Sequence, residues 1–181
     1  MKNIEQNRVA LFGDNSWLTL SFTKEWKNTY SFVEDYLNEN LSKKLAEKIM
    51  SDIKAVIYVL VHDGNGCEDI VLKTALLYLF CKKTGSDIKR LADNFSHYVI
   101  TGASILLDKN NPDYLENVFN NDEYTYLNKI KLAEYIAVIK SLKEKNDTET
   151  LNKKLETAKF IVNKYENQTH KGLMSLLKSL I

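Results

Sequence analysis

The scarcity of chain breakers constrains the fold of this sequence more than any other feature. Only one proline, Pro112, and six glycines occur among its 181 residues. Because proline ends helices and glycine weakens them, so few of either leave room for long regular elements. Apolar residues recur at spacings of three and four along most of the chain, which is the period of an amphipathic helix. The sequence therefore predicts a mainly α fold.

The predicted architecture is one domain over residues 1–181, a multi-helix bundle preceded by a small N-terminal β-hairpin. The hairpin covers residues 8–22, because residues 17–22 alternate apolar and polar after the Gly-Asp-Asn-Ser turn at 13–16. Gly85 is expected to end a helix, and Asp147 or Thr148 to begin one. The predicted helices cover about 24–53, 67–84, 87–107, 113–119, 124–144, 148–166 and 170–181. Within the first range, apolar residues from Leu41 to Ile53 suggest another helix after the polar residues 38–40.

Two apolar runs, residues 55–61 and 70–80, meet at a polar loop over residues 62–69. The first run is rich in β-branched residues but follows a helical pattern, so periodicity leaves both strand and helix open for it. The loop contains His62, one of three histidines, and Cys67, one of two cysteines. It is therefore the first place in the sequence to look for a site.

Composition narrows the function classes. The formal net charge is +1, so no global basic field argues for nucleic-acid binding as the main role. The lysines of the C-terminal helices alternate with acids, which is typical of a solvated helix face. Cys67 and Cys81 form neither a disulfide framework nor a zinc spacing. With no signal peptide and no apolar run of the ~18 residues that cross a bilayer, we expect a cytoplasmic protein without a membrane partner.

An apolar segment at residues 59–61 is followed directly by His62 and Asp63. This pattern resembles the HD-domain metal-dependent phosphohydrolases, in which an adjacent His and Asp ligate a divalent metal that activates water against a phosphoester. The resemblance implies His62 and Asp63 as metal ligands, with His97 as a stand-in for a later one. The family also has an earlier histidine, and none precedes His62 in this chain.

The same segment is similar to the phosphate loop of cysteine-dependent phosphatases if residues 55–61 form a strand. Asp63 then occupies the place of the nucleophilic cysteine, and Asp69 that of the arginine. Both place negative charge where a phosphate dianion would lie, so the resemblance implies a catalytically inactive relative. A calcium loop counted from Asp63 also fails, because its twelfth residue is Thr74 instead of glutamate.

Every near match to a catalytic motif thus lacks a required residue, while large aromatic residues gather in the first 36 positions. Because such residues dominate binding hot spots, the sequence favours a non-enzymatic protein-interaction module without a cofactor. It would be an adaptor, inhibitor or immunity-type antagonist that binds and occludes another protein. The candidate partner-binding residues are Asp63, Asn65, Glu68, Asp69, Trp17 and Trp26. The alternatives are a metal-dependent HD-like phosphohydrolase, a catalytically inactive phosphatase-like binding protein and a helical nucleic-acid-binding protein.

Overall fold

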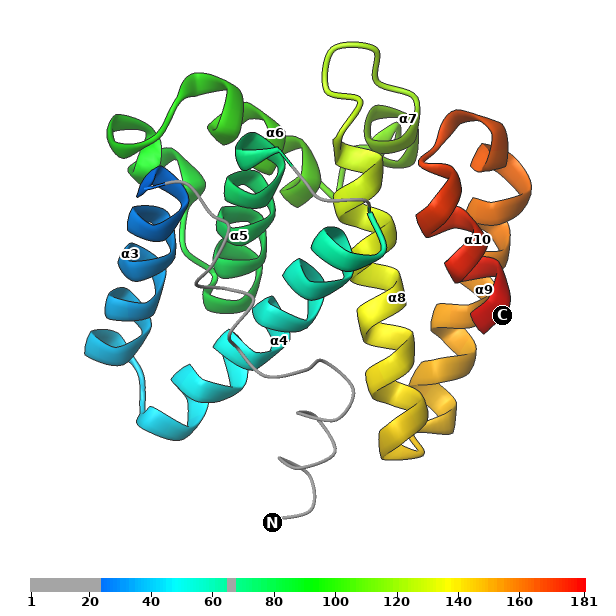
Figure 1. The fold of residues 1–181 in the computed structure, drawn as a ribbon, viewed down its shortest axis with the longest axis horizontal. Helices are drawn as coiled ribbons and strands as arrows, with labels where there is room; N and C mark the ends of the chain where they lie inside the picture. The colour runs from blue at the N-terminus through cyan, green and yellow to red at the C-terminus, as the bar shows by residue number, and fades with distance from the viewer. Residues whose placement is uncertain (1–23, 65–67) are drawn as a thin grey trace.

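The computed structural model describes residues 24–64 and 68–181, and this part of the chain is helical without a strand (Figure 1). The predicted mainly α fold is confirmed. The predicted hairpin over residues 8–22 lies outside the described residues. The α-helices are α3 (Lys24–Asn40), α4 (Lys43–His62), α5 (Asp69–Thr84), α6 (His97–Leu107), α7 (Tyr114–Phe119), α8 (Leu127–Lys145), α9 (Thr148–Tyr165) and α10 (Lys171–Leu180), and the 3-10 helices are η1 (Ile88–Asn94) and η2 (Glu166–Gln168).

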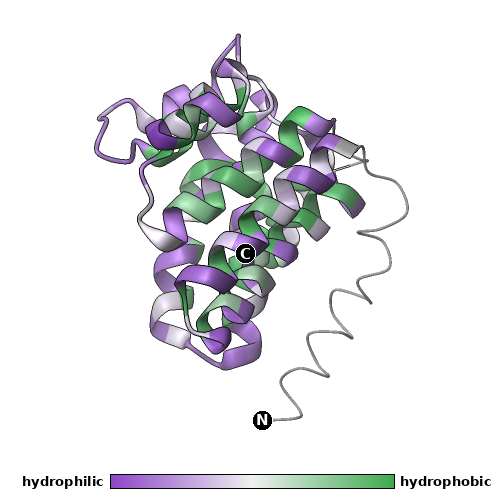
Figure 2. Ribbon diagram, turned by 90° about the vertical axis from the view of Figure 1, so that its left-hand side faces the viewer, coloured by the Kyte–Doolittle hydropathy of each residue, from purple (hydrophilic) through white to green (hydrophobic). Residues whose placement is uncertain are grey.

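Two helices, α5 and α8, organise the packing (Figure 1). α5 packs against α3, α4 and α6, and α8 packs against α4 on one side and against α9 and α10 on the other. Figure 2 shows hydrophobic residues along the inner helices and hydrophilic residues on the outer turns and loops. Along α5 the buried side chains surround the whole helix, including Tyr78 and Phe80. Within the described residues, no helix is both long and apolar enough to span a membrane.

Two predicted helical ranges each contain a break. The range 24–53 divides between α3 and α4, where Ser42 adopts an extended backbone and the Asn40 side chain donates a hydrogen bond to the carbonyl of Tyr36 at 2.8 Å. The range 87–107 divides into η1 and α6, because Ser96 is extended and its hydroxyl accepts a hydrogen bond from the Val99 amide. Side-chain caps and extended residues at these points interrupt a pattern that periodicity alone would continue.

Residues 55–61 belong to α4, so the segment that sequence patterns left undecided is helical.

The predicted end of α5 is confirmed at Gly85, which has a left-handed backbone (φ 74°) and donates its amide hydrogen to the carbonyl of Cys81 at 2.8 Å. The predicted start of α9 is confirmed at Asp147, whose side chain accepts from the Thr150 amide at 3.1 Å. Burial, with a smaller contribution from Asp87, raises the pKa of the Cys81 thiol to about 11.

Candidate functional site

The loop that the sequence singled out begins at the C-terminal end of α4. His62 is the last residue of that helix, and its ring stacks on Tyr58 with the centroids 4.2 Å apart. Asp63 is half-buried and donates its amide hydrogen to the carbonyl of Val59 at 3.0 Å. A helix before His62 agrees with an HD-like arrangement or a plain bundle. The phosphatase-like topology instead needs a strand there.

The other predicted site residues have different positions. Asn65 and Trp17 lie outside the described residues, and Glu68 is the exposed residue just before α5. Trp26 is 1% exposed and belongs to the hydrophobic core, with its ring centroid 6.0 Å from that of Tyr30. In residues 24–64 and 68–181, no three His, Cys, Asp or Glu side chains gather in a way that could hold a metal ion.

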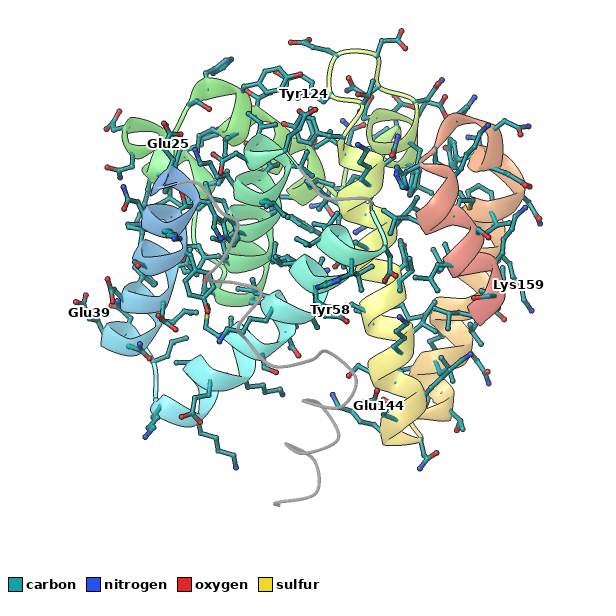
Figure 3. All side chains as sticks on the ribbon, viewed as in Figure 1. Glu25, Glu39, Tyr58, Tyr124, Glu144 and Lys159 are labelled. Carbon is teal, nitrogen blue, oxygen red and sulfur yellow. The ribbon has the colours of Figure 1, made fainter. Side chains whose placement is uncertain are left out.

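Asp69 lines a groove of about 640 Å³ between α3, α5 and the segment that enters α6. We call it the α3–α5–α6 groove. Figure 3 shows Glu25 at the N-terminal end of α3, beside this groove, and Glu39 at the opposite end of the same helix. Its lining residues are Glu25, Asn28, Thr29, Phe32, Asp69, Ile70, Lys73, Asn94, Phe95, Ser96 and Val99.

The polar side of the groove is an ion-pair network centred on Lys73. The Lys73 ammonium contacts Asp69 at 2.6 Å and also donates to Glu25. Burial lowers the pKa of Lys73, but the hydrogen bonds to Asp69 and Glu25 outweigh it, and the net pKa is raised. The side chain of Glu25 is 77% exposed, whereas that of Lys73 is only 14% exposed. Two carboxylates therefore face one ammonium, and the more accessible groups are the acids.

The apolar side of the groove is aromatic. Phe32 from α3 and Phe95 from the segment before α6 meet edge to face, with ring centroids 5.6 Å apart. Both rings are half-buried, so part of each remains accessible to a ligand in the groove. Neither Phe95 nor Glu25 was predicted to belong to a site, because the two lie far from Asp69 along the chain.

A second site is a buried charged network that we call the Glu134 cluster, made of Tyr78, Lys82, Lys131 and Glu134. The Glu134 carboxylate accepts hydrogen bonds from the Tyr78 hydroxyl at 2.8 Å and from the Lys131 ammonium at 2.6 Å. Lys82 donates to the other carboxylate oxygen, and Lys131 also contacts the Tyr78 hydroxyl at 3.1 Å. Two lysines and a tyrosine thus converge on one carboxylate between α5 and α8.

Protonation in the Glu134 cluster follows from burial and charge together. Burial alone would raise the pKa of Glu134, but Lys131 and Lys82 outweigh it and hold that pKa well below its usual range. Burial likewise opposes the charge on Lys131, yet Glu134 and Tyr78 raise its pKa well above the ordinary value. For Lys82 burial prevails, and its pKa falls to about 8. Lys82 is therefore the member of the cluster that titrates nearest neutral pH.

Further cations surround the Glu134 cluster. The Lys131 ammonium lies over the rings of Tyr114 and Tyr135, at 5.6 and 5.5 Å from their centroids, and Lys154 lies 6.0 Å from the Tyr135 centroid. Burial, followed by the charge of Lys131, lowers the pKa of Lys109. Lys82 and Lys131 therefore contact the Glu134 carboxylate, and Lys109 and Lys154 add further positive charge around them.

One side of the cluster opens into a cleft of about 190 Å³ between α4, α5 and α8. Glu134 and Lys82 lie in its wall, and Lys83 pairs with Asp52 across it at 2.8 Å. We call it the α4–α5–α8 cleft. Its lining residues are Asp52, Ala55, Val56, Leu79, Lys82, Lys83, Glu134, Ala137, Val138, Ser141, Leu142 and Lys145.

This second site was not predicted from the sequence. Lys82 belongs to a Lys-Lys pair at the end of a predicted helix, which is typical of a solvated surface, but the side chain is only 28% exposed and is paired with Glu134. A signal was present on α8, where Lys131 and Glu134 lie three residues apart in an otherwise apolar stretch, so that they share one helix face. A charged pair on a buried helix face is a sign of an internal ion pair.

Comparison of the chain with protein-family models, with curated proteins and with solved structures found no match.

Proposed function

We propose that this protein is a non-enzymatic interaction module that binds a partner protein through the α3–α5–α6 groove. It would act as an adaptor, inhibitor or immunity-type antagonist by occluding part of that partner. The observation that supports this proposal is the pairing of an aromatic wall with accessible carboxylates in one groove. Protein-binding surfaces combine these properties, because apolar contacts supply affinity and charges supply selectivity.

The chemistry of the groove indicates what the partner segment would carry. Because Glu25 and Asp69 exceed the charge of Lys73, a lysine or arginine of the partner would be attracted to the acidic side. An apolar neighbour of that residue would cover Phe32 and Phe95, and each Å² of apolar surface removed from water contributes about 25 cal/mol. The expected ligand is therefore a segment with a basic and an apolar residue close together.

Charge reversal at the groove tests the proposal, and α3 offers a matched control. Glu25→Lys changes the groove, whereas Glu39→Lys makes the same change at the far end of the helix, where the side chain is also exposed (Figure 3). Affinity capture from cells that produce the protein, with quantitative mass spectrometry, should identify a stoichiometric partner. We expect Glu25→Lys to reduce its retention about tenfold, which corresponds to 1.4 kcal/mol, and Glu39→Lys to leave it unchanged.

The proposal fails if no stoichiometric partner is captured, or if both variants retain the partner as well as the original protein does. Thermal unfolding of each variant must accompany the capture experiment. Lys73 keeps its contact with Asp69 in Glu25→Lys, so we expect that variant to remain folded. A loss of retention with unchanged unfolding temperature then reports on the groove itself.

A further inference from the structure

The N-terminus of α10 is capped by a histidine side chain. His170 is the residue before the helix, and its Nδ1 atom accepts a hydrogen bond from the Leu173 amide at 3.2 Å. The side-chain caps of η1, α6 and α9 are instead oxygens, from Asp87, Ser96 and Asp147. An ordinary carboxylate or hydroxyl oxygen accepts at any pH above about 5, whereas an imidazole nitrogen accepts only while it carries no proton. The cap on α10 is therefore one that a fall in pH removes.

α10 has little helical stability of its own. It has ten residues, and isolated helices shorter than about 12–15 residues are marginal in water. Gly172 in its first turn weakens it further; a methyl group there would lie 3.3 Å from the carbonyl oxygen of Asp63. The helix is held by packing on α8, α9 and η2, where Leu173, Met174 and Leu177 are at most 2% exposed (Figure 1). Loss of the cap therefore acts on an element that is near the limit of stability.

We propose that α10 is a pH-sensitive element of the fold, in which protonation of His170 at Nδ1 removes the cap and releases the first turn of the helix from α8. The proton comes from water, and the Leu173 amide then loses its acceptor and turns to water. The imidazolium ion would also lie at the positive end of the helix dipole, which disfavours a cation. This device is separate from the groove of the proposed function.

The surroundings of His170 act in the same direction. Burial, followed by the charge of Lys129 on α8, lowers the pKa of His170, and Lys171 adds a second cation beside it. The acids on the elements around α10 are Asp63 at the end of α4, Glu166 of η2, which is paired with Lys178, and Glu116 of α7, which is paired with Lys164 of α9.

The sign of the pH dependence follows from this lowered pKa. The open state takes up a proton near the ordinary histidine value of about 6.5, whereas the closed state does so at a lower pH. The contribution of the cap is therefore complete above about pH 6.5 and is lost as the pH falls below it. Among ordinary side chains, histidine is the one whose charge changes in this range.

Amide hydrogen exchange of the full-length protein tests the proposal. Exchange of α10 and of α5 is measured at pH 7.5 and pH 5.0, each relative to the intrinsic rate at that pH. We expect the protection of α10 to fall about tenfold at the lower pH, because the cap is lost and a charge is added at the helix N-terminus. The buried α5 should keep its protection, which distinguishes local opening of α10 from global unfolding.

Two variants and a second measurement complete the test. His170→Asn supplies a cap that does not titrate, so its α10 should be equally protected at both pH values. His97→Asn, the same change at the exposed first residue of α6, should behave like the original protein. Imidazole nitrogen shifts in NMR spectra should place the His170 proton on Nε2 at pH 7.5.

Three results would overturn the proposal: unchanged α10 protection in the original protein, an equal loss in His170→Asn, or a proton on Nδ1 at pH 7.5. A parallel loss of protection in α5 would also overturn it, because α10 would then open only with the whole fold. No partner protein enters this experiment, so its failure leaves the proposed function intact.

Discussion

Replacing Glu134 by glutamine removes the only carboxylate of the Glu134 cluster while nearly preserving its shape. The glutamine oxygen can still accept from Tyr78 or Lys131, but its amide group presents donors to Lys82, which is itself a donor. Lys82 is 28% exposed and can turn to water. Lys131 is only 5% exposed, so it would remain as a buried cation without a counter-ion.

The cost of this change can be estimated from Lys131. Its ammonium can escape the uncompensated burial by losing a proton, and pH 7 lies about 3.4 units below the ordinary lysine pKa of about 10.4. At 1.36 kcal/mol per unit, neutralising Lys131 costs about 4.6 kcal/mol. Removing one partner of a buried ion pair typically costs about 3–5 kcal/mol. We therefore expect Glu134→Gln to lower the free energy of unfolding by about 3–5 kcal/mol at pH 7.

Guanidinium unfolding followed by circular dichroism and by tryptophan fluorescence measures this difference. The control is Glu144→Gln, an exposed position near the end of the same helix (Figure 3), where we expect a change within about 0.5 kcal/mol. Adding Lys131→Met to Glu134→Gln removes the stranded cation and should recover part of the loss. If Glu134→Gln is as stable as Glu144→Gln, the account of Lys131 as a paired buried cation is wrong.

The pH dependence of stability gives an independent check. The folded-state pKa of Glu134 is depressed by Lys131 and Lys82, so its contribution is present above the unfolded-state value of about 4.3. The contribution is lost as the pH falls toward the folded-state pKa. The comparison uses the double variant of Lys131→Met and Glu134→Gln, because a neutral Lys131 in Glu134→Gln alone would itself take up a proton on unfolding. The stability difference between the original protein and this double variant should shrink between about pH 5 and pH 3. A difference that stays constant over this range would contradict the assignment.

Two further predictions concern Gly85 and His62. Gly85→Ala should lower the free energy of unfolding by about 1 kcal/mol, because φ is 74° and no atom lies within 4 Å of the added methyl group; unchanged stability in chemical denaturation would refute this. His62→Ala should leave partner retention unchanged, because His62 does not line the α3–α5–α6 groove. Metal found by elemental analysis in the original protein and lost in His62→Ala would instead favour the HD-like phosphohydrolase.

Patterns confined to one helix allowed most of the fold to be predicted. The C-terminal helices were located closely, because their apolar spacing and the cap at Asp147 act over a few residues. The polar residues 38–40 marked the break before α4, which begins at Lys43. The break at Ser96 was missed, although serine is a common helix N-cap and its hydroxyl accepts from the Val99 amide.

The sites were harder to predict than the fold, for the same reason. Of the candidates that the structure describes, only Asp69 lies in the groove, because the other walls come from residues as distant as Glu25 and Phe95. The Glu134 cluster joins Lys82 to a residue 52 positions later. Pairing across such separations is set by the arrangement of α5 on α8, and no local spacing encodes it.

α5 contributes to the α3–α5–α6 groove and to the Glu134 cluster, at opposite ends. Asp69 lies in its first turn and Lys82 in its last, and each charge is favourable at its end of the helix dipole. Lys73, which contacts Glu25, is about 13 Å from Lys82 along the axis at 1.5 Å per residue. At that distance the changes in unfolding free energy from Glu25→Lys and Lys82→Gln should add to within about 0.5 kcal/mol. A coupling above about 1 kcal/mol in a double-mutant cycle would show that α5 links the groove to the Glu134 cluster energetically.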